Sequence, residues 1–143
     1  MVAVPTVPGV LLAREGRSLV ERLRLWTASR WAAGADPWGT RADLVAHLVQ
    51  VLADAAADQE GRARLAVPRL GADMALPDQL AVMVDDIDRA GPGDAAAVAL
   101  TAHLLLHRSE LLGDTVPAGL ADALAGDPLV LGRRACRAGG RPL

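Results

Sequence analysis

Residues 18–38, SLVERLRLWTASRWAAGADPW, contain every aromatic residue of the chain. Ser18 and Glu21 have the spacing of a capping box, in which each side chain accepts a hydrogen bond from the other residue's backbone N–H. The stretch therefore predicts a helix over 19–32, and the glycine and the Asp-Pro pair that follow predict its end. Because the chain has no Phe and no Tyr, the three Trp rings have no aromatic competitors as core anchors.

Two roles are open to these rings. Trp26 and Trp31 lie on the apolar side of the predicted helix and Trp38 follows it, so the first interpretation buries two rings and lets Trp38 seal the turn. In the second, Trp31 and Trp38 stay exposed and anchor a partner, since Trp is enriched at interface hot spots. Leu25 falls outside the apolar face and is expected to be exposed. The predicted interaction surface consists of Arg24, Leu25, Arg30, Trp31 and Trp38.

Length and composition favour a single all-α domain. A chain of 143 residues can bury about two-thirds of its unfolded surface, and an apolar content dominated by Ala, Leu and Val favours helix over sheet. No apolar run is long enough to cross a bilayer, and the N-terminus lacks the basic region of a signal peptide. The single cysteine, Cys136, excludes an intrachain disulfide. We expect a cytoplasmic protein.

The apolar spacing predicts three more long helices, which gives a bundle of four main helices. These helices cover 41–59, capped by Thr40 and Asp43, then 77 to about 90, and 94 to about 112. The last of them is apolar over more than half of its circumference, which predicts that it lies at the centre of the bundle. Arg108 projects into that apolar arc and needs an acidic partner.

The segments between and beyond the helices complete a single domain over 1–143. We expect an extended N-terminal arm over 1–9, a long loop over 61–75 and a flexible tail over 138–143. The loop exceeds the usual helix–helix connection, and we expect its apolar residues to pack against the domain. These residues are Leu65, Val67 and Leu70. One or two short helices are expected from Pro117 to about Cys136.

Charge is balanced overall but unevenly distributed. Residues 1–41 carry six Arg against three acids, and residues 42–94 carry ten acids against four Arg. This layout favours packing of the first helix on the acidic middle, or two copies meeting head to tail. The balance favours neither nucleic acid nor an anionic membrane as partner. The acidic run over 85–94 lacks the ligand pattern of a calcium loop, so we expect an acidic helix end compensated by an arginine from elsewhere.

Histidine spacing provides the main chemical candidate. His103, His107 and Glu110 fall on one side of the predicted fourth helix and could supply three metal ligands, with His47 as a fourth. The glutamate of the HExxH protease pattern is missing, and such spacing is common by chance. The alternative is two histidines at the solvent edge of a polar helix face.

The sequence contains no phosphate-binding loop, no nucleophile elbow and no helix with the polar face of a DNA-recognition helix. We therefore expect no enzyme and no cofactor. The leading hypothesis is a noncatalytic helical protein-interaction module that could self-associate. The alternative is a helical protein that binds a small ligand or a metal on the face of His103, His107 and Glu110.

Overall fold

The structure is a computed structural model that describes residues 7–115, which form helices and no strand. In chain order the elements are α1 (Val7–Leu23), α2 (Ala28–Ala32), α3 (Arg41–Gln59), the 3-10 turn η1 (Asp73–Ala75), α4 (Leu76–Ala90) and α5 (Asp94–Leu112). The predicted all-α class is confirmed. The short helices and Cys136 expected near the C-terminus, and the tail over 138–143, lie outside the described residues. No helix among the described ones has the length and apolar content needed to cross a membrane.

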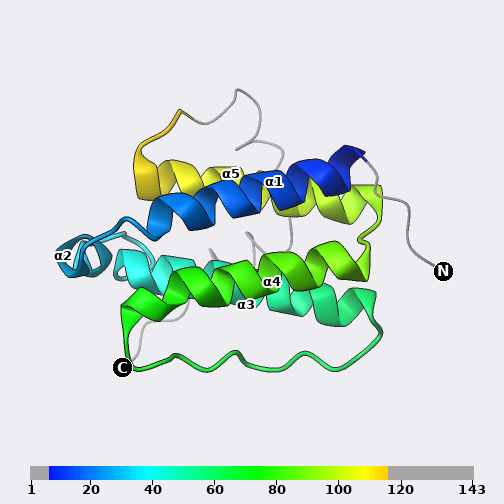
Figure 1. Ribbon diagram of the computed structural model, residues 1–143, viewed down its shortest axis with the longest axis horizontal. Coiled ribbons are helices and arrows are strands. Elements are labelled where there is room, and N and C mark those ends of the chain that lie inside the picture. Colours follow the sequence, from blue (N-terminus) through cyan, green and yellow to red (C-terminus); the bar gives the residue numbers. More distant parts are fainter. Residues whose placement is uncertain (1–6, 116–143) are drawn as a thin grey trace.

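The four long helices form a bundle around one apolar core (Figure 1). α1 packs against α4 and α5, and α3 packs against α4 and, less extensively, α5. The chain runs in one direction along α1 and α5 and in the opposite direction along α3 and α4. Because α3 and α4 are parallel neighbours, the chain must return along the whole bundle between them. A long crossover of this kind is one of the standard ways to connect four helices.

The crossover explains the long loop that the sequence predicts. α3 is about 28 Å long at 1.5 Å per residue, so no tight turn could start a parallel helix beside it. The return segment is fixed by polar contacts. The Gln50 side chain donates to the Leu65 carbonyl at 3.0 Å and accepts from the Val67 N–H at 2.8 Å. Val67 packs on the core, but Leu65 and Leu70 are 72% and 51% exposed, so the expectation that they pack was wrong.

The first helix differs most from prediction. α1 begins at Val7 and continues through Gly16, so the arm predicted over 1–9 is helical from Val7 onward. The expected capping box at Ser18 lies inside the helix. Gly16 is buried, and a Cβ there would lie 2.7 Å from a methyl carbon of Val84 on α4. The glycine therefore permits close helix packing, and the tertiary contact outweighs its low helix propensity.

The chain turns after Leu23 where the sequence predicts continuous helix. On a straight helix, residues five apart point about 140° away from each other, which would keep Trp26 and Trp31 from touching. The turn brings their rings to a centroid distance of 4.8 Å in an edge-to-face contact. Thr27 then caps α2 by accepting a hydrogen bond from the Arg30 N–H. Both rings are buried, which explains why the helix breaks here.

The bounds of the next helices agree closely with the sequence. α3 covers the predicted 41–59, and its capping box is formed: the Asp43 N–H donates to the Thr40 hydroxyl and the Thr40 N–H to the Asp43 carboxylate. α4 ends at Ala90, before Gly91, and α5 covers 94–112 with Gly93 as its cap in place of Asp94. The predicted central position of α5 was wrong, because this helix packs mainly on α1 and keeps an exposed side.

Candidate functional site

A cluster of rings fills the end of the bundle where α3 begins and α5 ends. The loop before α3 is closed by a β-bridge between Gly34 and Thr40. The backbone N–H of Trp38 donates a hydrogen bond to the Ala35 carbonyl at 2.7 Å. Gly39 takes a positive φ of 109°, and a Cβ there would collide with the Asp43 carboxylate. This turn projects Trp38 over the first turns of α3.

Trp38 joins the two helices through its ring and its N–H group. Its indole stacks on His47 at a centroid distance of 4.7 Å and meets His107 edge-on at 5.4 Å. His47 and His107 also meet edge-on, at 5.4 Å. The indole Nε1 donates to Glu110 Oε2 at 3.0 Å, which satisfies the polar atom of a partly buried Trp. Trp38 and Glu110 are 72 residues apart, so spacing along the chain offered no signal for this contact.

The predicted metal-binding face is therefore arranged differently. His103 and His107 are each 3% exposed, so the expectation of histidines at the solvent edge was wrong. The two imidazole rings stack with their centroids 6.2 Å apart. Glu110 Oε2 lies 3.7 Å from His107 Nδ1, outside hydrogen-bond range, and accepts from Trp38. Nowhere in residues 7–115 do three His, Cys, Asp or Glu side chains meet in a way that could hold a metal ion.

The residues of the predicted interaction surface are only partly exposed. Trp31 is 1% exposed and belongs to the core, so its expected role as an exposed anchor is corrected. The Arg30 guanidinium lies 5.1 Å from the centre of the Trp26 ring, a cation–π contact within the chain. Arg24 forms an ion pair with Asp78 of α4 at 3.3 Å. Leu25 is 81% exposed, as the sequence predicts.

A second apolar region lies open between α1 and α5. It is a hollow of about 280 Å³ whose lining is almost entirely apolar. The rim is formed by Val7, Leu11, Val98 and Leu105, and the floor by the buried residues Thr101 and Ala102. Val7 and Val98 are 83% and 57% exposed. The sequence analysis missed this region, although an apolar arc over more than half of the circumference of α5 was a signal for it.

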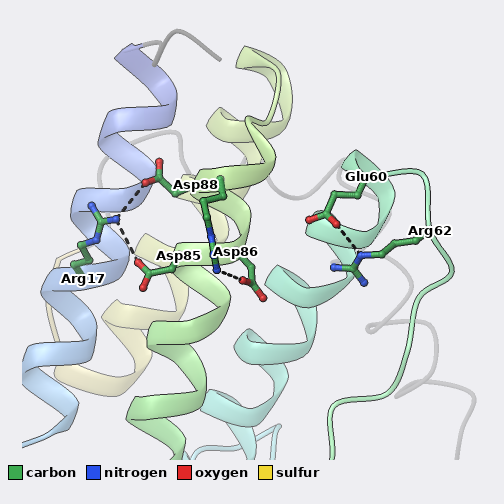
Figure 2. A network of polar contacts seen from close by, with 7 residues as sticks. Arg17, Glu60, Arg62, Asp85, Asp86 and Asp88 are labelled. Atoms are coloured by element: carbon green, nitrogen blue, oxygen red, sulfur yellow. Dashed lines mark hydrogen bonds and ion pairs between the residues drawn. The ribbon is translucent and has the colours of Figure 1, made fainter. Parts of the chain in front are cut away.

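Two arginines of α1 and the segment after it pair with acidic residues of α4, which is one of the two arrangements that the charge layout favours. Arg17 of α1 reaches Asp85 at 3.3 Å and Asp88 at 3.2 Å, so it compensates the acidic end of α4 (Figure 2). Arg108 finds the acidic partner that it needs in Glu15, at 3.1 Å, and also contacts Asp114 at 3.0 Å. Exposed pairs such as those of Arg17 contribute about 0–1 kcal/mol each, so they orient the helices more than they stabilise them.

Hydrogen bonds lower the pKa values of two carboxylates on α3. The Thr40 backbone N–H, followed by Arg69, lowers the pKa of Asp43 at the start of α3. Arg64 lowers the pKa of Asp58, which lies near the end of the same helix. Both carboxylates fix helix ends or the crossover loop, which is a structural role.

Comparison of the chain with protein-family models, curated proteins and solved structures found no match.

Proposed function

We propose that this protein is a noncatalytic helical interaction module that binds a protein partner through the α1–α5 face. We define this face by the exposed valines Val7 and Val98 together with the rim residues Leu11 and Leu105. One observation carries the proposal: the apolar residues Val7 and Leu11 of α1 and Val98 of α5 border one hollow and are left exposed by the bundle. Contiguous exposed apolar surface on a folded domain is typical of a binding site.

The chemistry of the ring cluster supports the noncatalytic part of the proposal. The two α5 histidines are almost fully buried by other side chains, and Glu110 holds an indole N–H in place. A general acid or base must come within hydrogen-bond reach of a substrate, and side chains packed in this way are poorly placed for that task. The cluster is better suited to fixing the end of α5 against α3.

The hollow could receive an apolar side chain of a partner helix. Two parallel helices form its walls, and its floor of small side chains lets an apolar side chain from a partner enter. An amphipathic helix presenting residues at i, i+3, i+4 and i+7 offers such a side chain.

Site-specific photo-crosslinking tests the proposal. A photoreactive amino acid at Val98, in the cell of origin, should give defined protein adducts. The matched control is the same substitution at Val82, which is 52% exposed on α4 and lies outside the α1–α5 face. The proposal predicts adducts that depend on position 98. Equal labelling at both positions, or no adduct at position 98, would contradict it.

A further inference from the structure

Two arginines at the end of the bundle that holds the Trp residues lie over the same indole ring. The Arg30 guanidinium of α2 is 5.1 Å from the centre of the Trp26 ring, and that of Arg41, at the start of α3, is 5.6 Å from it. The Arg41 N–H donates to the Ala33 carbonyl at 2.9 Å, which holds the start of α3 beside α2. Trp26 itself is only 4% exposed, so a partner that approaches this end meets the guanidiniums and not the ring.

Neither of these two guanidiniums forms an ion pair with a carboxylate of the described residues. Asp43, two positions after Arg41, pairs with Arg69, and Asp36 in the loop before α3 pairs with no described residue. Most other arginines in the described part of the chain do have a carboxylate partner there: Arg17, Arg24, Arg62, Arg64, Arg69, Arg89 and Arg108. A guanidinium that lies over a ring keeps its fork of N–H donors available for a carboxylate.

Exposed apolar side chains lie at the same end of the bundle. Leu25 directly precedes Trp26 and is 81% exposed, and Met74 of η1, the turn that contacts α2, is 57% exposed. The ion pair between Arg24 and Asp78 fixes the segment of Leu25 against the first turn of α4. This end therefore combines two cations without a carboxylate partner and an apolar side chain in a fixed position.

The charge of the site favours a short acidic partner. A nucleic acid strand needs a row of cations along its phosphates, whereas this chain has a net charge of −2. Two carboxylates of a peptide need only two guanidiniums, each of which can bind a carboxylate through two parallel hydrogen bonds.

We propose that Arg30 and Arg41, together with Leu25, bind an acidic peptide segment of a partner protein. Two carboxylates of the peptide accept hydrogen bonds from the guanidiniums, and an apolar side chain between them packs on Leu25. This site is separate from the α1–α5 face and does not depend on it.

Fluorescence anisotropy of the full chain with a labelled peptide in which Glu and Leu alternate tests the inference. The peptide should bind saturably, and the binding should weaken as the salt concentration rises to about 0.5 M, because salt screens exposed charges. The same peptide with Gln in place of Glu should not bind. Equal binding of the two peptides, or no binding of the Glu peptide, would overturn the inference.

Variants of the chain locate the site. Arg30→Gln combined with Arg41→Gln should raise the dissociation constant of the Glu peptide by about tenfold. Arg14→Gln combined with Arg89→Gln removes the same charge away from Trp26 and should change it by less than about twofold. Circular dichroism checks that both variants keep their helices. Equal losses in the two double variants would mean that the peptide only senses overall charge, and would overturn the site.

Two further variants separate the alternatives. Leu25→Ala, at an exposed position, should weaken the Glu peptide by about threefold without loss of helix. An oligonucleotide of equal charge that binds more tightly than the peptide, and that Leu25→Ala leaves unaffected, would assign the site to nucleic acid and overturn the inference. Val98→Glu should leave peptide binding unchanged, so this inference and the proposed α1–α5 face fail or stand separately.

Discussion

Two apolar regions of this protein differ in a way that composition does not reveal. The end of the bundle around Trp26, Trp31 and Trp38 holds the residues most typical of binding hot spots, yet it is closed by ring-to-ring contacts within the chain. The α1–α5 face is built from valines and leucines, which are ordinary core residues, yet it is open. Binding capacity therefore follows from which apolar groups the fold leaves uncovered, and residue type is a weaker guide.

The largest change in the free energy of unfolding should come from removing a buried ring at the Trp-rich end of the bundle. Trp31→Ala should lower the free energy of unfolding by about 3–5 kcal/mol, because it removes a large buried ring and leaves a cavity. Leu25→Ala, six positions earlier and 81% exposed, should change it by less than about 0.5 kcal/mol. Urea unfolding curves with equal slopes measure both values. Similar losses for the two variants would mean that the closed end is not core.

An intermediate change in stability should distinguish the buried side of α1 from its exposed side. Gly16→Leu should cost about 1–3 kcal/mol, because the side chain must enter the contact with Val84 of α4 and overpack it. Glu21→Leu, an exposed position on the same helix, is the control and should stay within about 0.5 kcal/mol. Thermal unfolding of the two variants compares them directly. A neutral Gly16→Leu would show that α1 and α4 are packed less closely than described.

The smallest change in stability should come from removing a charge at the Trp-rich end, since contacts between rings stabilise this end more than ion pairs do. The pKa of Asp43 is lowered in the folded state, first by the hydrogen bond from the Thr40 N–H and then by Arg69. Ionised Asp43 therefore stabilises the fold above its unfolded pKa of about 4. This contribution is lost as the pH falls through the lower, folded pKa.

Asp43→Asn should consequently reduce stability at pH 7 by no more than about 1 kcal/mol, and the difference from the unmodified chain should shrink as the solution is acidified below the unfolded pKa. Urea titrations at neutral and acidic pH measure it. A difference that stays constant down to low pH would show that the loss comes from the shape of the amide and not from the missing charge.

The success of the sequence predictions depended on how local the decisive interaction was. The capping box at Thr40 and Asp43 lies within four residues, and the predicted bounds of the helix after it agree with the structure at both ends. Helix α1 was misplaced because Gly16 is stabilised by a residue 68 positions away, and helix propensity alone cannot register such a contact. The arginine needed at the acidic end of α4 was predicted from charge alone, but its identity as Arg17 required the packing of α1.

The candidate sites follow the same pattern. Spacing correctly placed His103 and His107 on one side of one helix, but it could not show that this side faces Trp38 and α3. The sequence by itself determined the all-α class, the long helices after the first and the need for an acidic partner at Arg108, because each depends on periodicity, capping or charge within a few turns. Only the tertiary structure decided which apolar surfaces are covered. The parallel order of α3 and α4 and the edge position of α5 arise from contacts between residues far apart in the chain, and these contacts close the Trp-rich end and leave the α1–α5 face exposed.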